Sequence, residues 1–149
     1  MGHEFRLQAR APAAVTLLVD TSVWSLAFRR GARADVAEVG ALQRALKRGD
    51  PVISTGFVLQ ELLQGFSGPK ARTSLIERFS ALPFVSPTRQ DHVDAAELRN
   101  RCRRKGVQMG TIDALLAQLC ISHDLTLLST DKDFTHAAKH CPLRMWRAA

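Results

Sequence analysis

The sequence lacks any apolar run that approaches the ~20 residues needed to cross a bilayer. The longest apolar runs, residues 15–19 and 125–128, have the length of buried β-strands. Residues 1–14 are basic but contain no apolar stretch of the kind that a secretory signal peptide requires. These absences predict a cytoplasmic protein that has no membrane partner.

Cysteine is also scarce in this chain. The three cysteines, Cys102, Cys120 and Cys141, form no close pair in the sequence. This spacing argues against a disulfide framework and a Cys-x-x-Cys metal site, and it fits a reducing compartment. His136 and His140 lie four residues apart beside Cys141, a spacing that suits zinc, but no second cluster completes a set of four ligands. We therefore favour a chain without a zinc site.

Hairpin turn signals such as Asn-Gly and Asp-Gly are absent from between the strand-length apolar runs. Those runs are residues 17–19, 52–53, 84–85, 125–128 and 143–146. Segments with helical periodicity or helix start signals separate these runs. They lie at residues 36–48, 70–81, 89–105 and 111–122, and one more begins at residue 54 or 55 and ends between residues 65 and 68. Strands that alternate with helices favour a mostly parallel sheet covered on both faces, so the predicted fold class is α/β.

The length and charge of the chain set further bounds. A chain of 149 residues, 46% of them hydrophobic, is long enough for one domain with a core and too short for two. We predict a single domain over residues 15–149, preceded by a disordered and dispensable tail at residues 1–14. The formal net charge of +7 favours a polyanionic partner such as nucleic acid, although a basic surface alone does not require one.

Two aspartates follow strand-length apolar runs. Asp20 comes directly after residues 17–19, and Asp131 comes shortly after residues 125–128 with Asp133 close behind. In open α/β sheets, ligands bind at the carboxyl ends of the strands, near a switch in strand order. Each aspartate also has a simpler interpretation as the N-cap of the helix that follows it.

Two further acids are predicted to lie on helices. Glu61 is the only charged residue from Thr55 to Phe66, and a buried carboxylate needs a partner, a proton or a cation. An exposed Glu61 on the free face of an amphipathic helix is the alternative. Asp113 falls in the first turn of the helix over residues 111–122, where the helix dipole alone favours an acid by ~0.3–1 kcal/mol.

These four acids, Asp20, Glu61, Asp113 and Asp131, can converge on one mouth of the sheet. Two carboxylates ~4 Å apart repel by about 4 kcal/mol at an effective dielectric near 20, so such a cluster needs a counter-charge. Ligands that are all oxygen suit Mg²⁺ or Mn²⁺ better than zinc. One such ion, or a pair, can activate water for phosphodiester hydrolysis, so the residues predict a metal-dependent nuclease.

Four short segments carry these acids on the predicted strand ends and helices. They are Val19-Asp-Thr-Ser-Val-Trp24, Leu59-Gln-Glu-Leu-Leu-Gln-Gly65, Thr111-Ile-Asp-Ala-Leu-Leu-Ala117 and Leu127-Leu-Ser-Thr-Asp-Lys-Asp-Phe134. Each segment alone is weakly specific, but in this order they closely resemble the PIN-domain family, and most of all the VapC toxins of bacterial toxin–antitoxin pairs. The resemblance spans residues 17–145. It implies a three-layer α/β/α sandwich and an endoribonuclease with an acidic Mg²⁺ or Mn²⁺ site.

Carried over residue by residue, the resemblance implies three metal-binding acids, Asp20, Glu61 and Asp113, with Asp131 as the fourth. Asp133 falls in the same motif as Asp131 and is the less favoured metal ligand. Three nearby hydroxyls are candidates to hold a ligated water or a phosphate oxygen, or to cap a helix: those of Thr21, Ser22 and Thr130. The family further implies a VapB-like antitoxin that covers the acidic groove, and a homodimer.

Other interpretations stay open at this point. A catalytically silent PIN-like module would bind RNA or protein with the same fold, without needing the acids. A phosphatase with Asp20 as nucleophile lacks the second aspartate two positions on that haloacid-dehalogenase-like enzymes use, and no GxxxxGK[ST] phosphate loop is present. The basic residues of the run 99–105, and Arg29, Arg30 and Arg33, suit a solvated surface as well as a phosphate-binding one.

Overall fold

The computed structural model describes residues 15–29 and 35–149. The tail predicted at residues 1–14 and the basic residues Arg30 and Arg33 lie outside this described part. In it the chain forms a four-stranded sheet of β1 (Leu17–Val19), β2 (Val52–Ile53), β3 (Thr126–Leu128) and β4 (Arg144–Met145). All neighbouring strands are parallel, in the order β2-β1-β3-β4, which confirms the predicted α/β class.

The order of the strands creates a switch point in the sheet. From β1 the chain goes to β2 on one side, and later crosses to β3 on the other side of β1. Leu17 of β1 therefore pairs with Val52 and with Thr126, while Val19 pairs with Leu128. The carboxyl ends of β1 and β3 lie side by side where the connections diverge, which is where open α/β sheets bind ligands.

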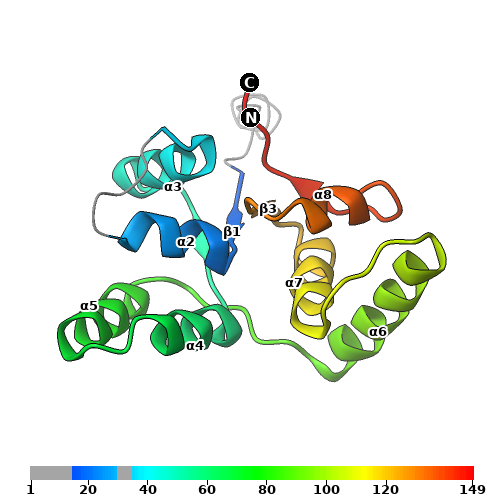
Figure 1. Ribbon diagram of the computed structural model, residues 1–149, viewed down its shortest axis with the longest axis horizontal. Coiled ribbons are helices and arrows are strands. Elements are labelled where there is room, and N and C mark those ends of the chain that lie inside the picture. Colours follow the sequence, from blue (N-terminus) through cyan, green and yellow to red (C-terminus); the bar gives the residue numbers. More distant parts are fainter. Residues whose placement is uncertain (1–14, 30–34) are drawn as a thin grey trace, which may run out of the picture.

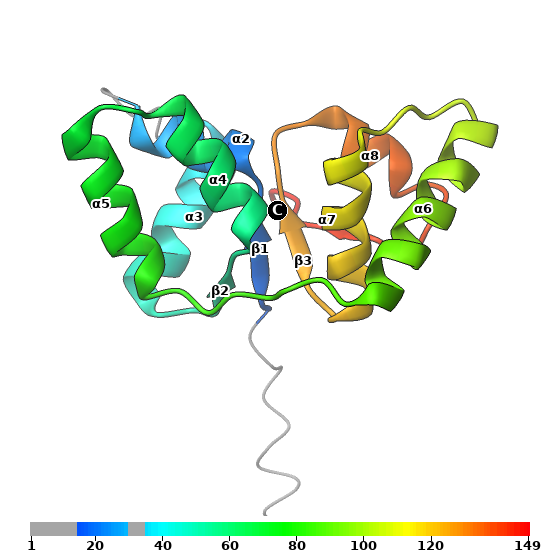
Figure 2. The same ribbon diagram turned by 90° about the horizontal axis from the view of Figure 1, so that it is seen from below.

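Helices cover the sheet on both sides, so the molecule has three layers, as Figures 1 and 2 show. One layer contains α2 (Thr21–Phe28), α3 (Ala37–Arg48), α4 (Gly56–Gly65) and α5 (Pro69–Ser80). The other layer contains α6 (Arg89–Arg104), α7 (Thr111–Ser122) and α8 (Lys132–Ala137). Within the described ranges, no helix combines the length and the apolar character needed to span a membrane.

The core fills the space between the sheet and these helix layers. Leu18 of β1 and Leu127 of β3 are fully buried, as are Leu42 of α3 and Leu116 of α7. Burying a leucine side chain of this kind contributes about 1.5–3 kcal/mol, so the packing holds the strand ends in fixed positions. The helix predicted over residues 111–122 is confirmed as α7 with the same bounds, because its apolar stripe faces this core.

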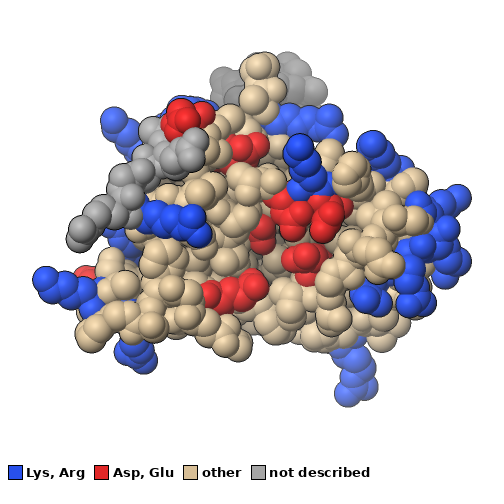
Figure 3. Space-filling view, viewed as in Figure 1, with Lys and Arg blue, Asp and Glu red and all other residues tan. Residues whose placement is uncertain are grey.

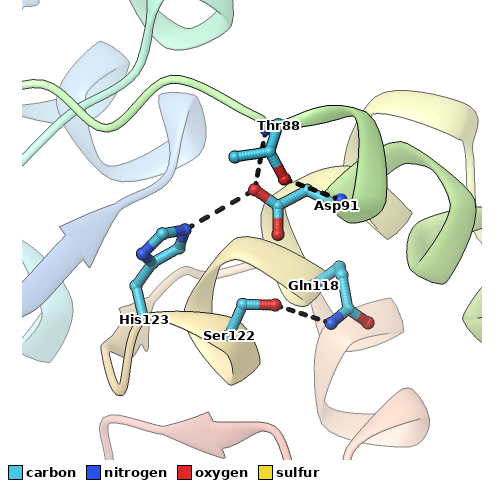
Figure 4. A network of polar contacts seen from close by, with 5 residues as sticks. All are labelled: Thr88, Asp91, Gln118, Ser122 and His123. Atoms are coloured by element: carbon cyan, nitrogen blue, oxygen red, sulfur yellow. Dashed lines mark hydrogen bonds and ion pairs between the residues drawn. The ribbon is translucent and has the colours of Figure 1, made fainter.

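A polar network ties α6 to α7 at the end where α6 begins (Figure 4). Thr88 and Asp91 form a capping box: the Asp91 N–H donates to Thr88 Oγ1 at 3.0 Å, and the Thr88 N–H donates to Asp91 Oδ2 at 2.9 Å. His123, directly after α7, places Nε2 3.5 Å from the same Oδ2. The first turn of α6 is therefore linked to the last turn of α7.

The strand predicted at residues 84–85 is wrong in extent. Only Phe84 takes part in a bridge, with Ser54 beyond the end of β2. Two backbone hydrogen bonds form it: the Ser54 N–H donates to the carbonyl of Pro83, and the Val85 N–H donates to the carbonyl of Ser54. Proline at positions 83 and 87 has no N–H to extend the ladder, so the pairing stops there.

The amino ends of the strands border a hollow of about 820 Å³. This hollow lies at the opposite end of the strands from the switch point. Val15 and Leu17 at the start of β1 contribute to its walls, together with Thr126 at the start of β3. The last strand and the residues after it contribute Arg144 and Arg147. Val15 and Arg147, near the two ends of the described chain, therefore line the same hollow.

Candidate active site

Asp20 lies at the carboxyl end of β1 with only 7% of its surface exposed. It occupies the N-cap position of α2, but its side chain makes no capping hydrogen bond. Instead, Asp20 Oδ2 accepts a hydrogen bond from Ser22 Oγ at 2.8 Å and one from Ser129 Oγ at 2.9 Å. Side-chain capping therefore does not explain this aspartate, whose Oδ1 accepts no hydrogen bond from a described residue.

Ser129 joins the two central strand ends. Its hydroxyl donates to Asp20, accepts from the Asp131 N–H at 3.0 Å and lies 3.4 Å from Ser22 Oγ. The candidate site residues chosen from the sequence do not include Ser129, although it lies in the fourth motif, at residues 127–134. Because Val19 pairs with Leu128, the residues that follow them, Asp20 and Ser129, are neighbours at the same edge.

Asp131 and Asp133 lie at the start of α8, directly beyond Ser129. Asp131 is the N-cap, and its Oδ1 accepts the Asp133 N–H at 2.9 Å, so the capping interpretation holds for this residue. Its side chain is partly buried, whereas Asp133 is exposed. Asp131 has one carboxylate oxygen engaged in the cap and the other without a hydrogen bond from the described part of the chain.

Glu61 occupies the exposed face of α4. The buried face of this helix is made by Val58 and Leu62, so the expectation of a buried Glu61 is wrong and the exposed alternative holds. The side chain is nevertheless anchored, because Thr21 Oγ1 donates a hydrogen bond to Glu61 Oε1 at 2.8 Å. Thr21 begins α2 directly after Asp20, so this contact directs Glu61 to the edge where Asp20 lies.

Asp113 sits in the first turn of α7 and is partly buried. Burial, together with the smaller effects of the negative charges of nearby acids, raises the pKa of its carboxyl to about 6. In decreasing order of effect, those acids are Asp20, Asp131, Glu61 and Asp133. The structure therefore brings all five predicted acids into one electrostatic neighbourhood, which we call the carboxylate mouth.

The surface shows the same grouping. In Figure 3, acidic side chains gather near the centre of one face, and lysine and arginine lie around them. Beneath this centre is Cys120 of α7, where burial, with a smaller effect of Asp20, raises the pKa of the thiol well above its ordinary value. This buried thiol is protonated at neutral pH and unsuited to ligate a metal.

The donor chemistry of the mouth fits a hard divalent cation. Its candidate ligands are carboxylate and hydroxyl oxygens, which suit Mg²⁺ or Mn²⁺. As positioned, the described side chains include no group of three or more His, Cys, Asp or Glu that could hold a metal ion. His136, His140 and Cys141 therefore do not form such a group either. Two of the candidate ligands, Glu61 and Asp133, are exposed.

The family model of the PIN domain matches residues 17–140. The match includes β1, β3 and every acid of the carboxylate mouth, and it spans far more than half of the chain. The chain therefore belongs to the PIN domain family. No curated protein sequence matches it.

Several solved structures share the fold of this chain. VapBC2 from Rickettsia felis, bound to a promoter DNA fragment, is 20% identical with a TM-score of 0.69, covering 91% of this chain and 100% of that chain. FitAcB from Neisseria gonorrhoeae is 23% identical with a TM-score of 0.64 and coverages of 89% and 97%. Mycobacterium tuberculosis VapC20, described as a toxin that cleaves the sarcin-ricin loop, is 21% identical with a TM-score of 0.61 and coverages of 87% and 99%.

Proposed function

We propose that this chain is a Mg²⁺- or Mn²⁺-dependent endoribonuclease that acts as the toxin of a type II toxin–antitoxin pair. The observation that carries the proposal is the gathering of five carboxylates where β1 and β3 end, with the pKa of Asp113 raised by burial and by the other four acids. A net negative site of this kind, on a chain with a formal charge of +7, suits a cation and a polyanionic substrate.

The carboxylates of the mouth differ in the hydrogen bonds that hold them, and we assign their roles on that basis. Hydrogen bonds from Ser22 and Ser129 fix Asp20 Oδ2, so the other oxygen of Asp20 is held in a defined orientation. Asp113 receives no hydrogen bond from a described residue, and its pKa is raised to about 6, chiefly by burial, so a cation bound there would displace its proton. When bound, a divalent cation would be held by Asp20, Asp113, Glu61 and Asp131, and would supply water activation and charge neutralisation at the phosphate.

The partners follow from the proteins that share the fold. Those proteins include VapBC2 bound to a DNA fragment from its promoter, FitAB bound to a DNA fragment, and VapC20, a toxin that cleaves the sarcin-ricin loop. We infer for this chain a cognate VapB-like antitoxin, an RNA substrate, a homodimer and a cytoplasmic location. We also infer that residues 15–149 form the functional nuclease domain.

A catalytically silent PIN-like module is the second candidate. It is favoured by one observation, namely that the described side chains are not grouped to hold a cation as they stand. Such a module would bind RNA or a protein partner through the same surface and would not cut.

The deciding experiment incubates the purified protein, freed of any antitoxin, with total RNA and Mg²⁺ or Mn²⁺. We expect cleavage that EDTA abolishes and that falls by about 100-fold or more in Asp20→Asn and Glu61→Gln. Glu77→Gln, an exposed charge on α5, is the matched control and should cleave like the native chain. Cleavage that survives EDTA, or that persists in both site variants, would contradict the proposal, and RNA binding without cleavage would favour the silent module.

A further inference from the structure

The hollow at the amino ends of the strands is lined by four arginines from two distant parts of the chain. Arg44 and Arg48 lie one helical turn apart on α3, whereas Arg144 belongs to β4 and Arg147 follows that strand. All four are exposed, and Asp50 is the only acid among the described residues that line the hollow. The hollow is therefore positively charged, at the opposite end of the strands from the carboxylate mouth.

Two of these arginines already have an acidic neighbour. Arg144 forms an ion pair with an exposed aspartate outside the hollow, and Arg48 Nη1 lies 4.0 Å from Asp50 Oδ2. Arg44 and Arg147 form no hydrogen bond or ion pair with a described residue. The helix dipole favours Arg48 in the last turn of α3, but it does not account for Arg147, which lies in no helix. Arg44 and Arg147 are thus available to an anion from solution.

The floor of the hollow is apolar. Leu17 of β1, Ala45 of α3 and Leu143 before β4 are all buried and line it. Trp146 lines it as well and is partly buried, and its backbone N–H donates to the carbonyl of Leu127 at 2.9 Å. An indole held in this way beside guanidinium groups offers a surface on which a flat aromatic ring can stack.

The size and charge of the hollow define the class of ligand. A volume of about 820 Å³ lies within the range of roughly 300–1,000 Å³ that is usual for small-molecule sites. Arginine suits phosphate because its planar fork donates two parallel hydrogen bonds, and several arginines suit several phosphates. Residues 1–14 contain Arg6 and Arg10 but only Glu4 as an acid, so charge does not favour that segment as the occupant.

We propose that this hollow binds a nucleotide with two or more phosphates, with its base against Trp146 and its phosphates against the arginines. A nucleotide matches both halves of the hollow, because it joins a flat aromatic ring to a chain of negative charges. The inference is independent of the proposed nuclease function, since the hollow includes none of the acids of the carboxylate mouth.

The test titrates the full-length native chain with ATP and with GTP in isothermal titration calorimetry. The buffer contains EDTA, because a divalent ion would let the phosphates bind at the carboxylate mouth instead. We expect saturable binding, accompanied by quenching of tryptophan fluorescence as the base stacks on Trp146. Inorganic triphosphate should bind at least roughly fivefold more weakly than ATP, because it lacks the base.

Two sets of variants examine the two halves of the hollow. Arg44→Gln combined with Arg147→Gln should weaken ATP binding by roughly tenfold or more, because it removes charge-assisted hydrogen bonds to the phosphates. Trp146→Leu should weaken binding by roughly fivefold or more and abolish the quenching, whereas Trp146→Phe should keep most of the affinity. A melting temperature like that of the native chain shows that each variant is folded.

The matched control combines Arg103→Gln with Arg104→Gln, two exposed cations of α6 that remove the same charge outside the hollow. This control should bind ATP within twofold of the native chain. Equal losses in the two double variants, the absence of saturable binding, or inorganic triphosphate that binds as tightly as ATP would overturn the inference. Displacement of ATP by polyglutamate as readily as by GTP would also overturn it, because the hollow would then suit an acidic peptide.

Discussion

Asp20 and Asp113 are neighbouring carboxylates in very different surroundings. Asp20 is the more buried of the two, yet it accepts hydrogen bonds from two hydroxyls. Asp113 accepts none from the described residues, so burial and four negative neighbours act on it without compensation. Carboxylates that differ in this way within one site are a common basis for separate acid–base roles.

The raised pKa of Asp113 makes a prediction about stability. The folded chain binds this proton more tightly than the unfolded chain, so the free energy of unfolding should fall as pH rises from about 4 to 6 and then level off. Without divalent metal, Asp113→Asn should therefore be more stable than the native chain at pH 7.5, by about 1–2 kcal/mol after solvent screening. Urea unfolding at pH 7.5 and pH 4 measures the difference, which should nearly vanish at pH 4.

The matched variant is Asp94→Asn, a partly buried acid on α6 outside the mouth, which should show no such pH-dependent gain. A gain from Asp113→Asn that is equal at both pH values would contradict the electrostatic explanation.

At the residue scale, sequence reasoning locates the acids but not their environments. The strand-end positions of Asp20 and Asp131 can be predicted from the sequence because a strand-length apolar run precedes each one. The exposure of Glu61 cannot be predicted in this way. Apolar residues lie around most of the circumference of α4, so the sequence does not show which face is buried. Ser129 is missed because its role depends on the pairing of β1 with β3, which no local pattern specifies.

At the scale of elements, the Asp91 carboxylate links the start of α6 to the end of α7. Burial alone would raise the pKa of Asp91, but hydrogen bonds from Thr88, His123 and Ser122 outweigh it and hold the pKa below its ordinary value. The stabilisation from Asp91 is thus present at neutral pH and is lost as pH falls through this lowered pKa.

We expect Asp91→Ala to lower the free energy of unfolding by about 2 kcal/mol at pH 7, because it removes a cap and charge-assisted hydrogen bonds at once. The difference from the native chain should shrink below about pH 4 as the native carboxylate takes up a proton. Chemical unfolding at pH 7 and pH 3 tests both statements. Thr88→Ser, which keeps a capping hydroxyl, is the control, and a loss from Asp91→Ala that persists undiminished at pH 3 would refute the role of the charge.

The helices α3 to α7 are predicted from the sequence with bounds close to those observed, because each has an apolar stripe that must face a core, whereas no bounds are predicted for α2 and α8. The helix predicted over residues 36–48 is Ala37–Arg48, and it ends at Gly49, whose φ of +75° suits glycine. The strand predicted at residues 84–85 is shorter than expected because apolar character alone does not take account of the prolines at positions 83 and 87. A strand pairs only if another strand offers it N–H and carbonyl groups, and the local sequence does not specify that partner.

At the scale of the whole molecule, charge is distributed unevenly. The chain has a formal net charge of +7, yet it concentrates five acids at one mouth. Like charges held this close reduce stability until a cation compensates them. The order β2-β1-β3-β4, which creates the mouth, cannot be derived from any one segment because it depends on how both helix layers pack.

We predict that Mg²⁺ raises the melting temperature of the native chain. At a concentration 100 times the dissociation constant, linkage gives about 2.7 kcal/mol, which corresponds to roughly 5–10 °C for a chain of this size. Asp20→Asn should show a much smaller shift, and NaCl at matched ionic strength serves as the control for screening. An equal rise in the variant, or an equal rise with NaCl, would argue against specific cation binding at the mouth.

The hollow at the amino ends of the strands has a practical consequence for handling the protein. Val15 and Arg147 both line it, so the polypeptide enters and leaves the described domain on the side of the sheet away from the mouth. A linker joined at either of these points extends from the back of the molecule. The chain can therefore be tethered to a bead or a biosensor surface with its acidic face turned toward solution.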